Sequence, residues 1–249
     1  MSDFNRGYSS IPAGRADMAV DAGLRSFMLG VYNKVALGLV LSAALAFATS
    51  AVPAIRDLLF SVTPDGRFAG VTPLGMAVQW SPVIAIFVGM FAMRNPSPRS
   101  SGIFYWVIVA LIGAGLGFIG LIYTGASIAS TFLISAASFG ALSLAGYTTK
   151  KDLTGFGSFL IVGLFGLIIA SVVNIFLHSS MMYFIINVLG VFIFAGLIAY
   201  DTQRLKTTYY QLGGNQAGLG VATNYGALSL YLDFINLFLF LLRIFGGRR

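Results

Sequence analysis

The stretch Ala227-Leu-Ser-Leu-Tyr-Leu-Asp-Phe-Ile-Asn-Leu-Phe-Leu-Phe-Leu-Leu242 decides the fold, because it is apolar almost throughout and yet carries one carboxylate. With its flanking residues it extends over Gly226–Phe245, which matches the roughly 20 residues that a helix needs to cross a lipid bilayer. This stretch therefore predicts a membrane-spanning helix.

Six further stretches of the chain have the same apolar character. The longest connections between them, residues 53–73 and 201–225, are too short to form an independent domain. The sequence therefore predicts an all-α, polytopic integral membrane bundle of seven transmembrane helices, residues 29–249, after a polar cytoplasmic N-terminal tail, residues 1–28. The six stretches are Leu29–Val52, Leu74–Met93, Ile103–Tyr123, Ile128–Tyr147, Phe156–Leu177 and Met181–Tyr200.

The composition excludes several other classes of protein. Hydrophobic residues make up 57% of the chain and charged residues only 9%, whereas a soluble domain carries about 25% charged residues. The net charge is +7, but Lys and Arg lie in the gaps between apolar stretches, so nucleic acid is not expected as a partner. The chain has no cysteine and no nucleophile–base set, zinc motif or phosphate-binding loop, which predicts neither an enzyme nor a resident cofactor.

The distribution of Lys and Arg predicts the orientation of the bundle. With a cytoplasmic N-terminus, nine basic residues would lie on the cytoplasmic side, against Arg56 and Arg67 in the first outer loop. Cytoplasmic loops carry such an excess of basic residues. The three arginines within residues 243–249 would then lie outside. Two readings stay open: the C-terminal tail tolerates this position, or the last segment enters the membrane and returns.

Asp233 is an ionisable side chain inside a predicted spanning helix. Such residues usually face the protein interior or a water-filled cavity. Ser229, Asn236 and Phe240 recur at helical spacing on the same face as Asp233. We expect this face to turn toward the interior of the bundle, with Ser229 and Asn236 on a possible ion path.

Two more charged residues are expected near Asp233. Asp201 ends the sixth predicted helix and Arg94 follows the second, both on the cytoplasmic side. Two carboxylates and one guanidinium would titrate as a unit, and such a unit can latch a pore and release it when its protonation changes. With Asn236 and water, the two aspartates would also form a weak, transient Ca²⁺ site, and weak binding suits permeation.

Four segments of the chain resemble the Bax inhibitor family, also called the transmembrane Bax inhibitor motif proteins. The resemblance extends from the first predicted helix to the C-terminus. Its most specific part is the segment around Asp233. The segments are Phe91-Ala-Met-Arg94, Lys150-Lys-Asp-Leu153, Ala199-Tyr-Asp-Thr-Gln203 and Tyr231-Leu-Asp-Phe-Ile-Asn-Leu-Phe238.

The resemblance implies a seven-helix bundle whose last helix is central, and a pH-sensitive Ca²⁺ leak across the membrane, the inner membrane for a bacterial member. It also implies that Asp201 and Asp233 are the pH-sensing pair and that Arg94 takes part in the latch. Some members carry an acidic residue in the second helix, whereas residues 74–93 of this chain carry no charge. The family includes suppressors of cell death and bacterial proteins related to stress.

Two functions from different classes remain. The leading hypothesis is a pH-regulated Ca²⁺ leak channel whose partners are the lipid bilayer, Ca²⁺ and protons. The alternative is a stress or cell-death regulator that binds other membrane proteins, such as a protease, and conducts no ions. A third reading, a secondary transporter, would need a substrate pocket at mid-membrane, whereas the predicted polar residues cluster toward one side.

Overall fold

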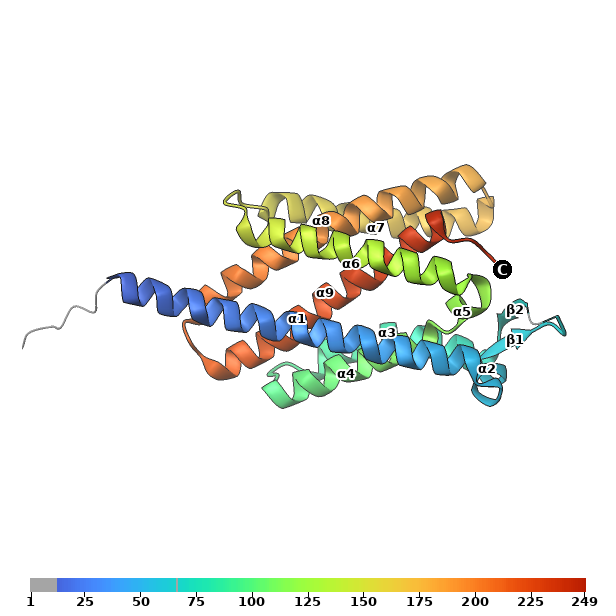
Figure 1. Ribbon diagram of the computed structural model, residues 1–249, viewed down its shortest axis with the longest axis horizontal. Coiled ribbons are helices and arrows are strands. Elements are labelled where there is room, and N and C mark those ends of the chain that lie inside the picture. The colour runs from blue at the N-terminus through green and yellow to red at the C-terminus, as the bar shows by residue number, and fades with distance from the viewer. Residues whose placement is uncertain (1–12, 66) are drawn as a thin grey trace, which may run out of the picture.

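The computed structural model describes residues 13–65 and 67–249, with side chains from residue 22 onward. Long helices lie side by side along one direction, and a small β-hairpin projects at one end (Figure 1). In chain order the elements are α1 (Ala13–Ala51), α2 (Pro53–Leu59), β1 (Phe60–Val62), β2 (Phe68–Val71), α3 (Pro73–Ala92), α4 (Pro98–Gly115), α5 (Phe118–Ile122), α6 (Gly125–Thr148), α7 (Thr154–Leu177), α8 (Ser180–Leu212) and α9 (Gln216–Phe245).

The predicted all-α membrane bundle is confirmed. In the described residues, seven helical segments are long and apolar enough to cross a membrane, and they coincide with the seven predicted stretches. The third of them, Pro98–Ile122, joins α4 and α5 across a short break after Gly115. The connection between α2 and α3 adds an antiparallel pair of strands that hydropathy does not predict, with Phe60 opposite Val71.

The first helix begins earlier than predicted. Residues 13–28, assigned from the sequence to a polar tail, belong to α1, while residues 1–12 of that tail lie outside the described residues. Leu24, Phe27 and Met28 are buried in the main hydrophobic cluster of the bundle. The start of the apolar run at Leu29 marks where contact with lipid begins. The helix itself begins earlier and includes the polar residues before Leu29.

The sixth spanning helix also extends further than predicted. The expected connection of residues 201–225 is mostly helical, because α8 continues to Leu212 and α9 begins at Gln216. The turn between them needs two glycines, since Gly213 and Gly214 have φ angles of +53° and +86°, a region that side chains disfavour. Asn215 then caps α9 by accepting a hydrogen bond from the N–H of Gly218 at 3.1 Å.

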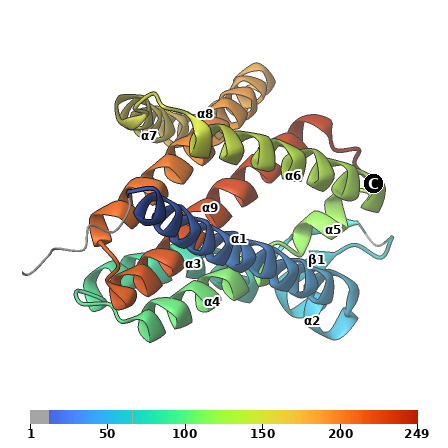
Figure 2. The same ribbon diagram turned by 60° about the vertical axis from the view of Figure 1, so that its left-hand side comes forward.

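The last helix occupies the centre of the bundle, as the family resemblance implies. In its most apolar 18-residue window 61% of the residues are buried, against 11% for α7. It packs against α1, α4, α6 and α8, and Figures 1 and 2 show it running diagonally through the other helices. Any polar side chain that α9 carries at this depth is therefore held inside the protein.

Hydrogen bonds between helices fix α9 within this packing. The Ser42 hydroxyl of α1 donates to the carbonyl of Val109 in α4 at 3.1 Å, and its oxygen lies 2.6 Å from the Tyr231 hydroxyl of α9. Since Ser42 has a single proton to donate, Tyr231 is the donor in the second bond. Gly113 allows α4 this close approach, because a Cβ there would lie 2.6 Å from the Cα of Ser42.

The C-terminus lies at the opposite end of the bundle from the start of α9 (Figure 1). Beyond Phe245 the chain is attached to the turn between α5 and α6, where the N–H of Thr124 donates to the carbonyl of Gly247 at 3.0 Å and the N–H of Arg249 donates to that of Ile122 at 2.9 Å. Thus α9 runs the length of the bundle as one helix and contains no returning segment, which agrees with the reading of a full crossing.

Candidate functional site

Two neighbouring helices bring Asp201 and Asp233 together. Asp201 lies in α8 and Asp233 in α9, and these side chains come within hydrogen-bonding reach of each other. The residues are only 7% and 6% exposed, respectively. Two carboxyl groups this close can share a proton, so the protonation of one depends on that of the other.

The depth of the pair follows from the residues around Asp201. Two positions further along α8, the side-chain amide of Gln203 accepts from the N–H of Leu153 at 2.8 Å and donates to the carbonyl of Lys151 at 2.7 Å. Asp201 therefore lies close to the level of the connection between α6 and α7. The pair is toward the end of the bundle from which α1 and α9 start, as the sequence predicts.

The cation at the pair is Arg204. Its Nη2 lies 3.3 Å from Oδ1 of Asp201 and 3.2 Å from Oγ of Ser229 in α9, and its guanidinium lies 5.6 Å from the ring centre of Tyr200. Arg204 thus compensates the carboxylates and links α8 to α9. Its side chain remains 48% exposed, so solvent screens part of this interaction.

Arg94, the cation predicted for this position, lies elsewhere. It is exposed in the connection between α3 and α4, and among the described side chains it forms no ion pair with either aspartate. The sequence does not predict Arg204, because the apolar run ends at Tyr200 while the helix continues beyond it. Once the helix continues, the spacing of three residues between Asp201 and Arg204 places them on one face.

A cavity of about 550 Å³ adjoins the pair between α7, α8 and α9. Its lining includes Ser229, Asp233, Asn236 and Phe240, so the face that their spacing predicts does turn toward a cavity. The opposite wall is formed by side chains of α7 and is apolar except for Ser171. Asp233 is the one charged residue among the described residues of the lining.

Two oxygen atoms in this cavity have free acceptor capacity. Within the described residues, Oδ2 of Asp233 is buried without a hydrogen-bond donor. The Asn236 side chain donates its Nδ2 to the carbonyl of Leu232 at 2.8 Å, and this leaves its Oδ1 available. No three His, Cys, Asp or Glu side chains gather anywhere in the described part of the chain. A cation here would be held by these few oxygens and water, which makes a weak site.

A second polar chain, which the sequence analysis missed, meets α8 next to the pair. The Tyr32 hydroxyl of α1 lies 2.6 Å from Oγ of Ser143 in α6, and that oxygen lies 2.9 Å from Oγ1 of Thr202 in α8. Thr202 is fully buried beside Asp201 in the sequence. These hydroxyl residues are more than 50 positions apart in the chain, and no sequence pattern connects them. Their contact can be recognised only once the packing of the helices is known.

The chain is similar to proteins of several bacteria and matches one protein family over most of its length. Residues 24–249 match the family described as inhibitor of apoptosis-promoting Bax1. An uncharacterized protein of Caulobacter vibrioides is 67% identical over 250 residues, the full length of both chains. A protein of Rickettsia prowazekii is 45% identical over 229 residues, 92% of each chain. The inner membrane protein YbhL of Escherichia coli K12 is 40% identical over 238 residues, 94% of this chain and 98% of its own.

Proposed function

This chain belongs to the Bax inhibitor family and is an integral, multi-pass membrane protein, and on this premise we propose that it is a pH-regulated Ca²⁺ leak channel gated by Asp201 and Asp233. One observation supports the proposal above the others: two carboxyl groups from different helices meet beside a cavity, with one guanidinium, from Arg204, to compensate them.

The gate would work through the contact between α8 and α9. In the closed state the shared proton and the bonds of Arg204 to Asp201 and Ser229 hold the two helices together. When both carboxyl groups are ionised, one guanidinium faces two negative charges in a region of low dielectric, where their repulsion is strong. A change in protonation would thus change the free energy of the closed contact.

The cavity between α7, α8 and α9 would form the part of the ion pathway that lies next to the aspartate pair. Ca²⁺ prefers oxygen ligands, and the free oxygens of Asp233 and Asn236 point to a passage where an ion is bound briefly and released. In this proposal the protein is not an enzyme, has no resident cofactor, has a cytoplasmic N-terminus and lies in the inner membrane of a bacterium. The excess of Lys and Arg at the end where α1 starts supports that orientation.

The test is Ca²⁺ flux into liposomes that contain the purified full-length protein, measured with an entrapped indicator across a range of pH. Asp201→Asn and Asp233→Asn each remove one proton site and keep the size of the side chain. We expect each to change the flux and to flatten its dependence on pH. Asp152→Asn is the matched control, because Asp152 is exposed in the connection between α6 and α7.

The outcomes separate this proposal from its alternative, a regulator that binds other membrane proteins and conducts no ions. Flux that is absent from the wild type, or identical in the Asn variants, would contradict the channel. A deletion of residues 1–12 then tests the alternative, because loss of partner binding with unchanged flux would assign that segment to partners. The deletion stops before Leu24, which is buried in the bundle.

A further inference from the structure

The groove between α1 and α6 has a polar end and an apolar end. These helices run side by side without packing closely against each other (Figure 1). Two cavities open along the groove, one of about 1030 Å³ near the start of α1 and one of about 290 Å³ nearer its end. Neither cavity includes Asp201 or Asp233.

The larger cavity has the chemistry of a site for an anionic headgroup. Among the described side chains that line it, the charged ones are Arg25 of α1 and Lys206 of α8, and none is a carboxylate. Neither cation forms an ion pair with any side chain of residues 22–65 or 67–249. Lys206 donates to the carbonyl of Tyr147 at 3.3 Å and lies 5.6 Å from the centre of its ring, which leaves the ammonium two further protons to donate.

The position of this cavity agrees with that chemistry. Tyr32, Tyr147 and Tyr210 also line it, and tyrosines gather at the level of lipid headgroups. The rest of its wall is mainly apolar, with Met28, Leu144 and other side chains, and also carries the hydroxyls of Ser143 and Thr148. A basic pocket between spanning helices on the cytoplasmic side is a known setting for anionic lipid headgroups.

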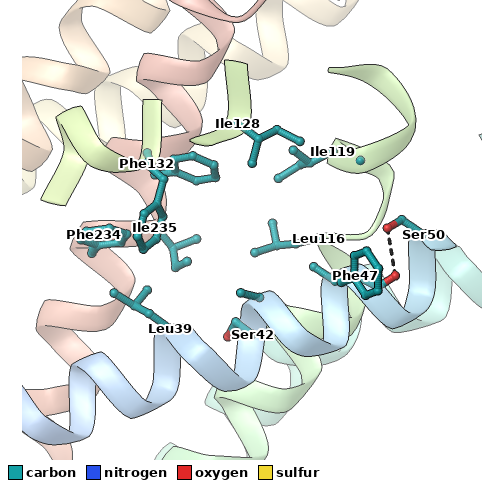
Figure 3. Close-up of a pocket in the computed structure, with 14 residues that line it drawn as sticks. Leu39, Ser42, Phe47, Ser50, Leu116, Ile119, Ile128, Phe132, Phe234 and Ile235 are labelled. Atoms are coloured by element: carbon teal, nitrogen blue, oxygen red, sulfur yellow. Dashed lines mark hydrogen bonds between the residues drawn. The ribbon is translucent and has the colours of Figure 1, made fainter. Parts of the chain in front are cut away.

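The smaller cavity continues the groove toward the middle of the bundle. Figure 3 shows Leu39 of α1, Phe132 and Ile128 of α6 and Ile235 of α9 around one space. Its lining is apolar except for the hydroxyls of Ser42 and Ser50, of which Ser42 is already hydrogen-bonded to Val109 and Tyr231. An apolar cavity of about 150 Å³ already accepts benzene, so this larger one can take part of an acyl chain.

The length of the groove suits one leaflet of a membrane. Arg25 and Leu39 are separated by about 21 Å along α1 at 1.5 Å per residue. The hydrocarbon of one leaflet is about 15 Å thick, which leaves room for the glycerol and phosphate above it. Phe139 lies between the two cavities, with its ring 6.5 Å from that of Tyr32 and 5.6 Å from that of Phe234.

We propose that the groove between α1 and α6 binds one acidic phospholipid, with its phosphate between Arg25 and Lys206 and one acyl chain directed toward the apolar cavity beside Leu39. The site is separate from the aspartate pair and goes beyond the proposed channel function. The paired cations select an anionic headgroup, and the apolar groove selects a lipid over a free phosphate.

Native mass spectrometry of the full-length protein in detergent tests this site, with phosphatidylglycerol and phosphatidylcholine offered in equal amounts. We expect retained phosphatidylglycerol in excess of phosphatidylcholine. In the double variant Arg25→Gln and Lys206→Gln, the affinity for phosphatidylglycerol should fall by about fivefold for each cation and so about 25-fold in total. The variant Arg94→Gln and Arg99→Gln removes the same charge from exposed positions of the same end and should keep the lipid.

A second pair of variants tests the groove without changing any charge. Gly140 lines the larger cavity, and a Cβ there meets no atom within 4 Å. Gly140→Leu should therefore fill the cavity and weaken phosphatidylglycerol binding while the protein stays folded. Gly166→Leu is the control, since Gly166 of α7 is equally open and lines a groove that has no charged residue.

Several results would overturn the proposal. One is equal retention of the two phospholipids by the wild type. Another is an equal loss of phosphatidylglycerol in the Arg94 and Arg99 variant, which would indicate attraction by diffuse charge. Displacement of the lipid by millimolar glycerol 1-phosphate would indicate an anion site that does not need the acyl chain. Unchanged binding in Gly140→Leu would place the lipid outside the groove.

Discussion

Arg204 offsets the negative charge of the two buried aspartates. It is the cation that contacts Asp201, and through Ser229 it also reaches α9. Removing one member of a compensated group leaves the remaining charges without a partner. The proposed closed state of the channel therefore depends on Arg204 more than on any loop residue.

We predict that Arg204→Gln raises Ca²⁺ flux at neutral pH, because it removes the bonds to Asp201 and Ser229 that hold α8 and α9 together in the proposed closed state. The liposome assay measures this directly. Arg94→Gln is the informative comparison, since Arg94 is exposed and makes no ion pair with the aspartates among the described residues. An effect of Arg94→Gln alone would return the latch to the residue that the family resemblance implies.

Tyr231 is a residue whose polar contact can be removed without exposing an unsatisfied group. In Tyr231→Phe, Ser42 keeps its hydrogen bond to Val109, so only one bond between buried hydroxyls is lost. We expect a loss of about 1 kcal/mol in the free energy of unfolding, seen as a lower melting temperature in detergent. Tyr183→Phe, at a half-exposed position of α8, should leave that temperature unchanged.

At the scale of elements, the close contact between α6 and α8 depends on Gly146, which has no side chain. A Cβ on Gly146 would collide with the backbone carbonyl of Ala199. Because backbone cannot move aside as a flexible side chain does, a larger residue must separate the two helices. This contact lies close to Thr202 and Asp201, so the spacing of α6 and α8 also sets the position of the aspartate pair.

Gly146→Leu should destabilise the bundle by about 1–3 kcal/mol through overpacking, measured as a fall in melting temperature. Gly140→Ala on the same helix is the matched control, since that position faces open space. There the better helix propensity of alanine should stabilise the protein by up to about 1 kcal/mol. Equal effects at the two positions would mean that helix propensity, and not the contact with α8, is responsible.

Hydropathy predicted the elements that cross the membrane and missed the places where helices end. All seven spans were found, because an apolar run of about 20 residues has few alternatives. The extension of α8 from Asp201 to Leu212 was missed, since a helix can leave the lipid and continue in water. Because the sequence does not show this extension, it does not predict that Arg204 lies near the pair. It does single out Asp201 and Asp233, because a carboxylate in or next to an apolar run is unusual.

At the scale of the whole molecule, a full crossing by α9 requires that its two ends lie on opposite sides of the membrane. The chain has no cysteine, so a cysteine introduced at one position can be labelled uniquely. We predict that Arg249→Cys in intact cells reacts with a membrane-impermeant maleimide, whereas Lys151→Cys reacts only after the membrane is opened. Arg67→Cys, in the hairpin connection, should behave like Arg249→Cys. Matching reactivity of positions 151 and 249 would contradict a full crossing by α9.

The central position of α9 has a consequence for the biosynthesis of the protein. Translation produces α1 to α8 first, and the helix that the bundle packs around emerges only after them. Until then, Ser42 and the other residues that contact α9 are left to lipid, water or the insertion machinery. A chain that stops before Gln216 therefore lacks the element that α1, α4, α6 and α8 share. Such a product would reach the membrane with its spans inserted but unassembled, in the form that membrane proteases degrade.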